Sequence, residues 1–193
     1  LFVVLFYFFL GAVYSQPPKK SKRGQQINIS PVHKFSNKFE INVRSPNSLN
    51  KEEEINFFKK FNPDVVVVVA YGKIIPPQLL NLKNIKFLNI HASLLPKWRG
   101  AAPIQRAIME GDDETGISIM QIISELDAGP YMLQEKIKID KKDNYISLSK
   151  KLCNLGTKLI LKSLKLIEQN NYKFVEQSKN NISYAKKINK KES

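Results

Sequence analysis

The sequence predicts an α/β fold with a mostly parallel sheet and helices on both faces, and two segments indicate it most strongly. Residues 65–70 are five consecutive valines and an alanine, the pattern of a strand buried on both faces of a parallel sheet. Residues 144–170 place leucines at spacings of three and four, with lysines between them. This pattern predicts a long amphipathic helix whose apolar stripe belongs to the core.

Length and composition favour one intracellular domain. A chain of 193 residues is long enough for one sizeable core and too short for two large ones. Cys153 is the single cysteine, so no intramolecular disulfide can form, and His33 and His91 alone make no metal cluster. These features fit a reducing, cytoplasmic setting. The net charge of +14 suggests a polyanionic partner, although lysine, asparagine and isoleucine are all abundant and total charge is weaker evidence than its distribution.

The first 61 residues predict two strands, a basic loop and a helix. Residues 1–10 are apolar, too few to span a bilayer and without a basic flank, so a buried strand is favoured over a membrane segment. Residues 14–34 are basic and rich in proline and serine, which predicts a mobile loop. Residues 39–43 read as a short strand, and residues 48–61 as a helix capped by Ser48.

The central stretch holds the first candidate site residues. Residues 87–90 read as a strand, and Asn89 and His91 share one face because they are two positions apart. Pro96 ends the strand, and ligands bind at the carboxyl ends of strands in open α/β sheets. The pair could therefore stabilise charge on a carbonyl oxygen. A lone histidine at a strand end is more often structural, and its polar neighbours favour the functional interpretation.

The second half continues the alternation of strands and helices. Residues 101–110 predict a helix, 115–123 and 131–139 predict strands, and 144–170 predict the long helix. Gly156 within that helix indicates a bend or a close contact, and Cys153 is expected to be a small core residue. Asp127 lies in the loop at 125–129, where an aspartate before glycine is usually only a turn former.

Several motifs in this order resemble the folate-dependent formyltransferases. They are NIHASLLPKWRGAAPIQRAI, ETGISIMQ and LDAGP, with VVVVVAYGKIIP and QPPKKSKRGQQ upstream. The resemblance runs from about residue 12 to 188. Within the family, the motifs most resemble those of the members that formylate methionyl-initiator tRNA. It implies a Rossmann-like catalytic domain that takes a formyl group from 10-formyltetrahydrofolate without a metal.

The resemblance also implies a role for each candidate residue. Asn89 and His91 would stabilise the oxyanion, and Asp127 would orient His91 and help to move protons. The folate would be held by Ser93, Leu94, Leu95, Pro96, Tyr71 and Gly72. The tRNA would be contacted by Arg23, supported by Lys19, Lys20 and Lys22. The expected protein is a monomer that does not bind membranes.

The same resemblance divides the chain and leaves alternatives open. Residues 1–178 would form the catalytic domain, with an atypical or truncated start, and residues 179–193 a basic linker toward a C-terminal domain that the chain does not contain. A formyltransferase acting on an amino sugar or glycinamide ribonucleotide could share the three central residues. A formyltetrahydrofolate hydrolase could do so as well. A non-catalytic RNA-binding remnant is the alternative from another class.

Overall fold

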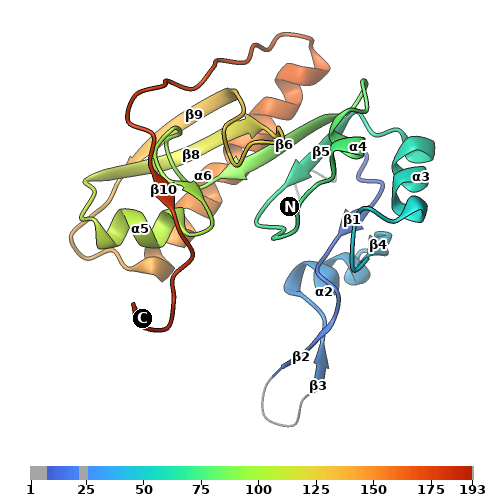
Figure 1. Cartoon of the computed structure of the whole chain (residues 1–193), viewed down its shortest axis with the longest axis horizontal. Coiled ribbons are helices and arrows are strands. Elements are labelled where there is room, and N and C mark those ends of the chain that lie inside the picture. Colours follow the sequence, from blue (N-terminus) through green and yellow to red (C-terminus); the bar gives the residue numbers. More distant parts are fainter. Residues whose placement is uncertain (1–7, 22–25, 193) are drawn as a thin grey trace. The chain divides into compact units, whose positions relative to one another are not determined.

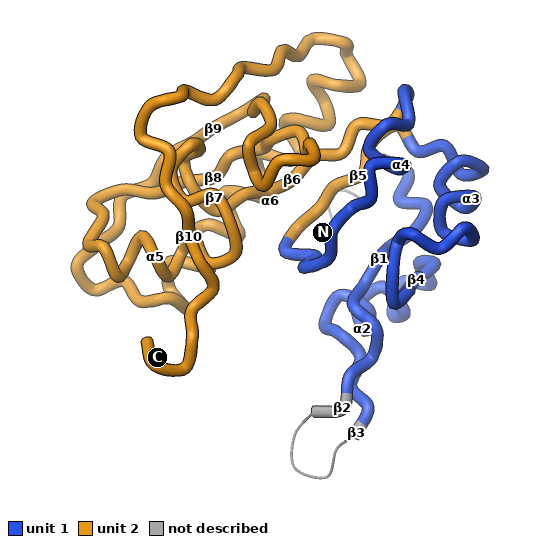
Figure 2. The backbone as a smooth tube through the Cα atoms, viewed as in Figure 1, with its two compact units in different colours: residues 1–63, 70–84 blue, residues 64–69, 85–193 orange. Residues whose placement is uncertain are grey.

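The computed structural model describes residues 8–21 and 26–192. Its backbone forms two compact units, which Figure 2 distinguishes by colour. Unit 1 comprises residues 1–63 and 70–84, and unit 2 comprises residues 64–69 and 85–193. Strands and helices alternate in both, so the predicted α/β class is confirmed.

In its described residues, unit 1 combines short strands with three helices. β1 pairs in parallel with β4, and β2 pairs antiparallel with β3. Its elements in chain order are β1 (Val13–Tyr14), β2 (Lys19–Ser21), β3 (Gln26–Asn28), α2 (Pro31–Lys38), β4 (Val43–Arg44), α3 (Glu52–Phe61) and α4 (Pro77–Leu80).

A polar and aromatic cluster joins β1, β4 and α3. The Tyr14 ring stacks on Phe58 with centroids 5.1 Å apart, and its hydroxyl donates to Glu54 at 2.7 Å. Arg44 Nε donates to the same carboxylate at 2.8 Å. Burial raises the pKa of Tyr14, and the hydrogen bond to Glu54 raises it further. Burial alone would raise the pKa of Glu54, but the hydrogen bonds from Arg44 and Tyr14 outweigh burial and lower it.

Two expectations for this part of the chain were wrong. The segment 14–34 contains β2, β3 and the start of α2 rather than a featureless loop. Ser30 caps α2 by accepting from His33 N at 3.0 Å, and Pro31 occupies the first turn, where a missing N–H costs nothing. The N-cap of α3 is Lys51 rather than Ser48, whose hydroxyl instead accepts from Asn50 N.

Unit 2 is built on a four-stranded sheet with the order β5-β6-β8-β9. The β5–β6 pairing is parallel, whereas β6–β8 and β8–β9 are antiparallel, so this sheet is mixed rather than mostly parallel. Figure 1 shows the long helix α6 running along this sheet. The elements of unit 2 are β5 (Val65–Val68), β6 (Lys86–His91), β7 (Arg99–Gly100), α5 (Pro103–Met109), β8 (Glu114–Gln121), β9 (Tyr131–Lys138), α6 (Tyr145–Glu168) and β10 (Tyr184–Ala185).

The leucine stripe of α6 forms the core of unit 2, as its spacing predicted. Asn144 caps this helix by accepting from the backbone N–H groups of Ile146 and Ser147. The stripe packs against apolar residues of β6, β8 and β9 in one buried cluster. Cys153 is exposed, so its predicted core position was wrong. It follows Leu152, and a step of one residue turns a side chain about 100° away from the buried stripe.

The valine-rich strand and the C-terminal segment also differ from their predictions. β5 is an edge strand, and Val67 and Val69 are 40% and 59% exposed rather than buried on both faces. Within the stretch expected to be a linker, β10 pairs in parallel with β7. Residues 179–193 therefore contribute a strand to unit 2.

Candidate active site

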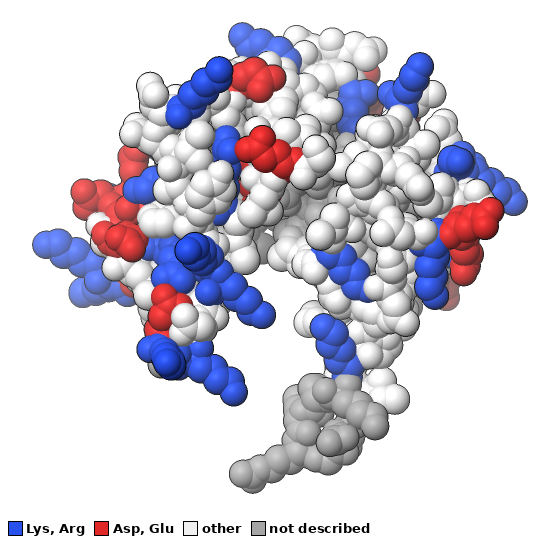
Figure 3. Space-filling model, viewed as in Figure 1, with Lys and Arg blue, Asp and Glu red and all other residues white. Residues whose placement is uncertain are grey.

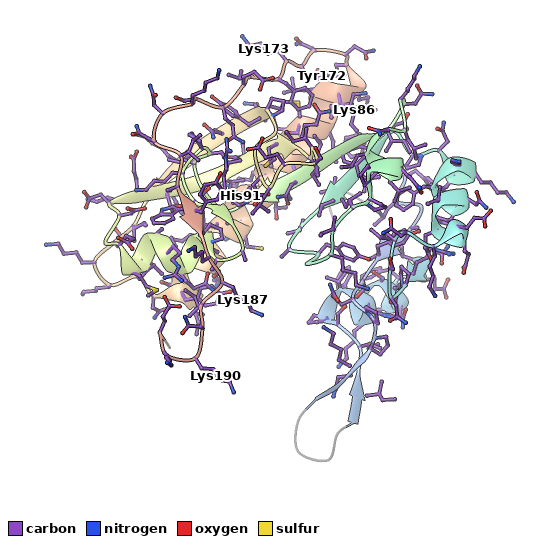
Figure 4. All side chains as sticks on the ribbon, viewed as in Figure 1. Lys86, His91, Tyr172, Lys173, Lys187 and Lys190 are labelled. Carbon is purple, nitrogen blue, oxygen red and sulfur yellow. The ribbon has the colours of Figure 1, made fainter. Side chains whose placement is uncertain are left out.

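Strand β6 brings Asn89 and His91 to one side of the unit 2 sheet. Ile90 between them points toward α6, because a Cβ placed on Gly156 would come within 3.0 Å of its Cγ2 atom. Side chains alternate along a strand, so Asn89 and His91 lie on the face away from α6. Of the bend or close contact predicted at Gly156, the structure shows the close contact. Figure 4 labels His91 at the end of β6.

Asp127 meets both side chains from the loop that follows β8. Its Oδ1 atom accepts a hydrogen bond from Asn89 Nδ2 at 3.3 Å. Its Oδ2 atom accepts from the backbone N–H of Gly100 at 2.9 Å and lies 3.7 Å from His91 Nδ1. Asp127 has a left-handed φ of 46°, which aspartate tolerates better than most residues. The structure thus brings the three predicted catalytic residues together.

The tautomer of His91 is fixed by a backbone carbonyl. His91 is 4% exposed, and its Nε2 atom lies 2.8 Å from the carbonyl oxygen of Trp98. A carbonyl can only accept, so Nε2 carries the proton. Nδ1 then faces Asp127 with a lone pair when the ring is neutral and with an N–H when it is charged. The Trp98 carbonyl therefore selects the tautomer of the neutral ring, and the Asp127 carboxylate faces the other ring nitrogen.

Trp98 holds its carbonyl in place through an unusual backbone conformation. Its φ is 61°, which is rare for a bulky residue and is maintained only where neighbours enforce it. The indole Nε1 donates to Asp112 at 2.7 Å, and the backbone N–H donates to Ser183 Oγ at 2.9 Å. Lys97 also donates to Asp112 at 2.7 Å. Contacts from α5's C-terminal turn and from the segment before β10 thus aim the carbonyl at His91.

The loop after β6 is held by two polar side chains of the sheet. Ser118 Oγ donates to Ser93 O at 2.6 Å and accepts from Leu95 N at 3.1 Å. Gln134 Nε2 donates to Leu95 O at 2.8 Å and to Ser118 Oγ at 2.9 Å. Of the four predicted folate-binding residues here, Ser93 and Leu95 are buried within the protein. Leu94 and Pro96 are partly exposed.

The other two predicted folate-binding residues belong to unit 1. Gly72 has a φ of +70°, a conformation that glycine adopts without strain. Gln16 Nε2 donates to the carbonyl of Tyr71, which fixes this turn. Burial raises the pKa of the Tyr71 hydroxyl, and the charge of Glu54 adds to this effect.

Two of the four predicted tRNA-binding residues fall in the described part of unit 1. Lys19 and Lys20 belong to β2, and the Lys19 side chain is exposed. Lys22 and Arg23 lie outside the described residues. Figure 3 also shows Lys and Arg side chains gathered where the C-terminal segment of unit 2 ends. Its lysines beyond β10 are Lys186, Lys187, Lys190 and Lys191.

Two negative findings apply to residues 8–21 and 26–192. No group of three or more His, Cys, Asp or Glu residues there is arranged to hold a metal ion. No helix in those ranges is long and apolar enough to cross a membrane.

Three contributors to the site were not predicted from the sequence. They are the Trp98 carbonyl, the Asp112 carboxylate and Gln177, whose side chain reaches the backbone of the Asp127 loop. For the Trp98 carbonyl, the only indication in the sequence was the position of Trp98 between the Asn-x-His pair and a glycine. Nothing near Asp112 or Gln177 in the sequence connects them to His91.

Comparison with known protein families identifies the family of the chain. The model of the formyl transferase family matches residues 10–164. The chain belongs to the formyl transferase family. The match covers both β6 and the Asp127 loop. Gln177 and β10 lie beyond it.

Two curated relatives show which members of the family the chain resembles in sequence. The chain is 48% identical over 186 residues to the methionyl-tRNA formyltransferase of Pelagibacter ubique (strain HTCC1062), covering 96% of this chain and 60% of the relative. It is 49% identical over 177 residues to the methionyl-tRNA formyltransferase of Wolbachia pipientis subsp. Culex pipiens (strain wPip), covering 92% and 58%. The chain thus spans less than two thirds of the length of these curated relatives.

Solved structures agree on the fold. Phosphoribosylglycinamide formyltransferase from Streptococcus pneumoniae TIGR4 superposes with a TM-score of 0.71 at 20% identity, over 86% of this chain and 90% of that one. A sugar 3N-formyl transferase, solved in the presence of dTDP and 5-N-formyl-THF, gives a TM-score of 0.69 at 22% identity, over 95% and 63%. Both carry the formyltransferase fold, which confirms the predicted Rossmann-like architecture.

Proposed function

We propose that this chain provides the catalytic part of a methionyl-tRNA formyltransferase. It would transfer the formyl group of 10-formyltetrahydrofolate to the α-amine of methionyl-initiator tRNA, for translation initiation in the cytoplasm. The observation that carries the proposal is the meeting of Asn89, His91 and Asp127 at the carboxyl end of β6. The two methionyl-tRNA formyltransferases named above support this acceptor over an amino sugar or glycinamide ribonucleotide.

The proposed reaction needs an oxyanion site and a route for one proton. The neutral amine attacks the formyl carbon, and the carbonyl electron pair moves onto the oxygen. The amine then loses a proton, the oxygen re-forms the carbonyl as the bond from carbon to folate N10 breaks, and N10 gains a proton. The products are the formylated amine and tetrahydrofolate, so the step needs no oxidant.

We propose specific atoms for these tasks, on the basis of the site geometry. Because His91 Nε2 is committed to Trp98 O, Nδ1 is the ring nitrogen free to exchange a proton. The protonated ring donates from Nδ1 to the oxyanion, and Asn89 Nδ2 supplies the second donor. Asp127, 3.7 Å from Nδ1, stabilises the charged ring while the proton moves toward N10.

The substrate contacts remain part of the proposal. The loop formed by Ser93, Leu94, Leu95 and Pro96 would contact the folate. The family resemblance makes the backbone at Tyr71 and Gly72 a separate proposed folate contact. The burial of Ser93 and Leu95 indicates that this loop would contribute backbone groups and the Leu94 and Pro96 side chains. Arg23, with Lys19, Lys20 and Lys22, would contact phosphates of the tRNA. We propose a monomer.

Release of tetrahydrofolate from 10-formyltetrahydrofolate tests this function, measured with and without methionyl-initiator tRNA. The proposal predicts release that requires the charged tRNA. Release that ignores the tRNA would replace it with a hydrolase. Salt-sensitive tRNA binding without any release would replace it with an RNA-binding remnant.

A further inference from the structure

The side chain of Gln177 connects the backbone of the Asp127 loop to the side chain of Arg99 in β7. Its Nε2 group donates to Asp127 O at 2.8 Å and to Gly129 O at 2.7 Å. Its Oε1 atom accepts from Arg99 Nε at 3.0 Å and from Arg99 Nη2 at 2.8 Å. All four hydrogen-bonding positions of one amide are therefore used on the Asp127 loop and β7.

The orientation of this amide is determined by its partners. A guanidinium group can only donate, so the amide oxygen must face Arg99. Two backbone carbonyls can only accept, so the NH₂ group must face Asp127 and Gly129. The reversed amide would leave all four contacts repulsive.

This bridge contacts the Asp127 loop where its backbone is most constrained, at Asp127 and Gly129. Asp127 has a left-handed φ of 46°, and a Cβ on Gly129 would come within 2.0 Å of Gln121 O. The loop thus needs an external support to keep this path. Gln177 provides it from outside the residues that the family model matches.

The same bridge couples the loop to β7, which holds the Asp127 carboxylate. Arg99 is 5% exposed and donates to Glu125 at the start of the loop as well as to Gln177. The next residue, Gly100, donates its N–H to Asp127 Oδ2. Displacing the loop relative to β7 would therefore lengthen this hydrogen bond and change the distance from Oδ2 to His91 Nδ1.

We propose that Gln177 is a positioning residue that sets the Asp127 carboxylate against His91. The inference extends the proposed function, and its predicted effect on kcat rests on that function. The side chain of Gln177 hydrogen-bonds to the loop backbone and to Arg99, so it acts through these two partners.

Gln177→Glu separates positioning from simple structural support. A glutamate keeps an oxygen for Arg99 but loses both donors and places an oxygen against two carbonyls. We expect kcat to fall about 10- to 100-fold, the loss that follows misplacement of a catalytic group by roughly 1 Å. The KM for 10-formyltetrahydrofolate should change less than about twofold. Gln169→Glu is the matched control, because that glutamine lies exposed just after α6, and it should keep the parental kcat.

A second readout does not depend on turnover. Amide hydrogen exchange of Gly100, followed by NMR on the full chain, reports its bond to Asp127 Oδ2. Gln177→Glu should speed this exchange about tenfold or more while the exchange of core amides in β8 stays as in the parent. If the parent releases no tetrahydrofolate, the proposed function fails and the exchange result alone decides the inference. Parental kcat or parental Gly100 exchange in Gln177→Glu would overturn it.

Discussion

His91 donates a hydrogen bond from Nε2 to the backbone carbonyl of Trp98, 2.8 Å away. This contact leaves Nδ1 as the ring nitrogen that faces Asp127. The backbone conformation of Trp98, with its φ of 61°, therefore determines which nitrogen of a buried histidine can exchange a proton. The chemistry assigned to His91 depends on a residue seven positions later in the chain.

Removing the support of Trp98 should weaken catalysis through His91. Asp112→Ala deletes the acceptor for Trp98 Nε1 and Lys97 Nζ, each a charge-assisted bond. We expect a loss of about 1.5–3 kcal/mol in the free energy of unfolding and a fall in kcat of about tenfold or more. Denaturant unfolding and steady-state kinetics measure the two effects. The neighbouring exposed Asp113→Ala is the control, and equal behaviour of both variants would contradict this role.

The oxyanion role of Asn89 predicts a large loss of turnover. Asn89→Ala removes one donor from the site, which typically costs about 3–4 kcal/mol of transition-state stabilisation. We expect kcat to fall on the order of 100-fold or more, while Asn84→Ala on the surface should change it little. A rate for Asn89→Ala within tenfold of the parent would remove this residue from the mechanism.

The loop after β6 should depend on the buried hydroxyl of Ser118. Ser118→Ala leaves Ser93 O and Leu95 N without their partner. We expect a loss of about 1–3 kcal/mol in the free energy of unfolding, the cost of unsatisfied buried polar groups. Ser163→Ala is a matched control, because Ser163 is equally buried but its hydroxyl has no hydrogen-bond partner. The proposed support of the loop would be refuted by equal losses in the two variants.

Stability should fall in acid through Asp143 at the start of α6. A hydrogen bond from Lys151, followed by those from Ser147 and the Asp140 backbone, lowers the pKa of Asp143 from 3.8 to about 2. Because the folded pKa is depressed, this stabilisation is complete above pH 3.8 and is lost as the pH falls through about 2. Asp143→Asn should therefore show a weaker loss of stability between about pH 4 and pH 2, measured by denaturant unfolding. An unchanged pH dependence, equal to that of Asp113→Asn, would contradict this assignment.

The basic residues near β2 should matter for tRNA rather than for folate. Arg23→Ala removes a predicted phosphate contact, so we expect a higher KM for methionyl-tRNA and an unchanged KM for 10-formyltetrahydrofolate. Lys162→Ala, an exposed cation on α6, controls for the loss of one positive charge. Equal losses toward both substrates would rule out a specific tRNA contact.

The parts of the site that follow from local periodicity were predictable. Asn89 and His91 share a face because strand side chains alternate every two residues. The α6 core followed from the leucine spacing. Asp127 was indicated only by the family resemblance, since an aspartate before glycine is usually a turn former.

The parts that depend on tertiary contacts were not predictable. The left-handed backbone of Trp98 is enforced by Asp112 and Ser183, which lie 14 and 85 residues away in sequence. Gln177 likewise reaches Asp127 across 50 residues. The exposure of Cys153 could have been predicted from helical geometry, because it directly follows a core leucine.

The most direct test of the central claim is the appearance of N-formylmethionine on initiator tRNA. The full chain is mixed with methionyl-initiator tRNA and 10-formyltetrahydrofolate labelled in its formyl group, and the amino acid released from the tRNA is analysed. We predict labelled N-formylmethionine, formed at a rate at least about 100-fold lower in Asn89→Ala. Labelled formate without N-formylmethionine, or equal product from the two proteins, would contradict the proposed function and its mechanism.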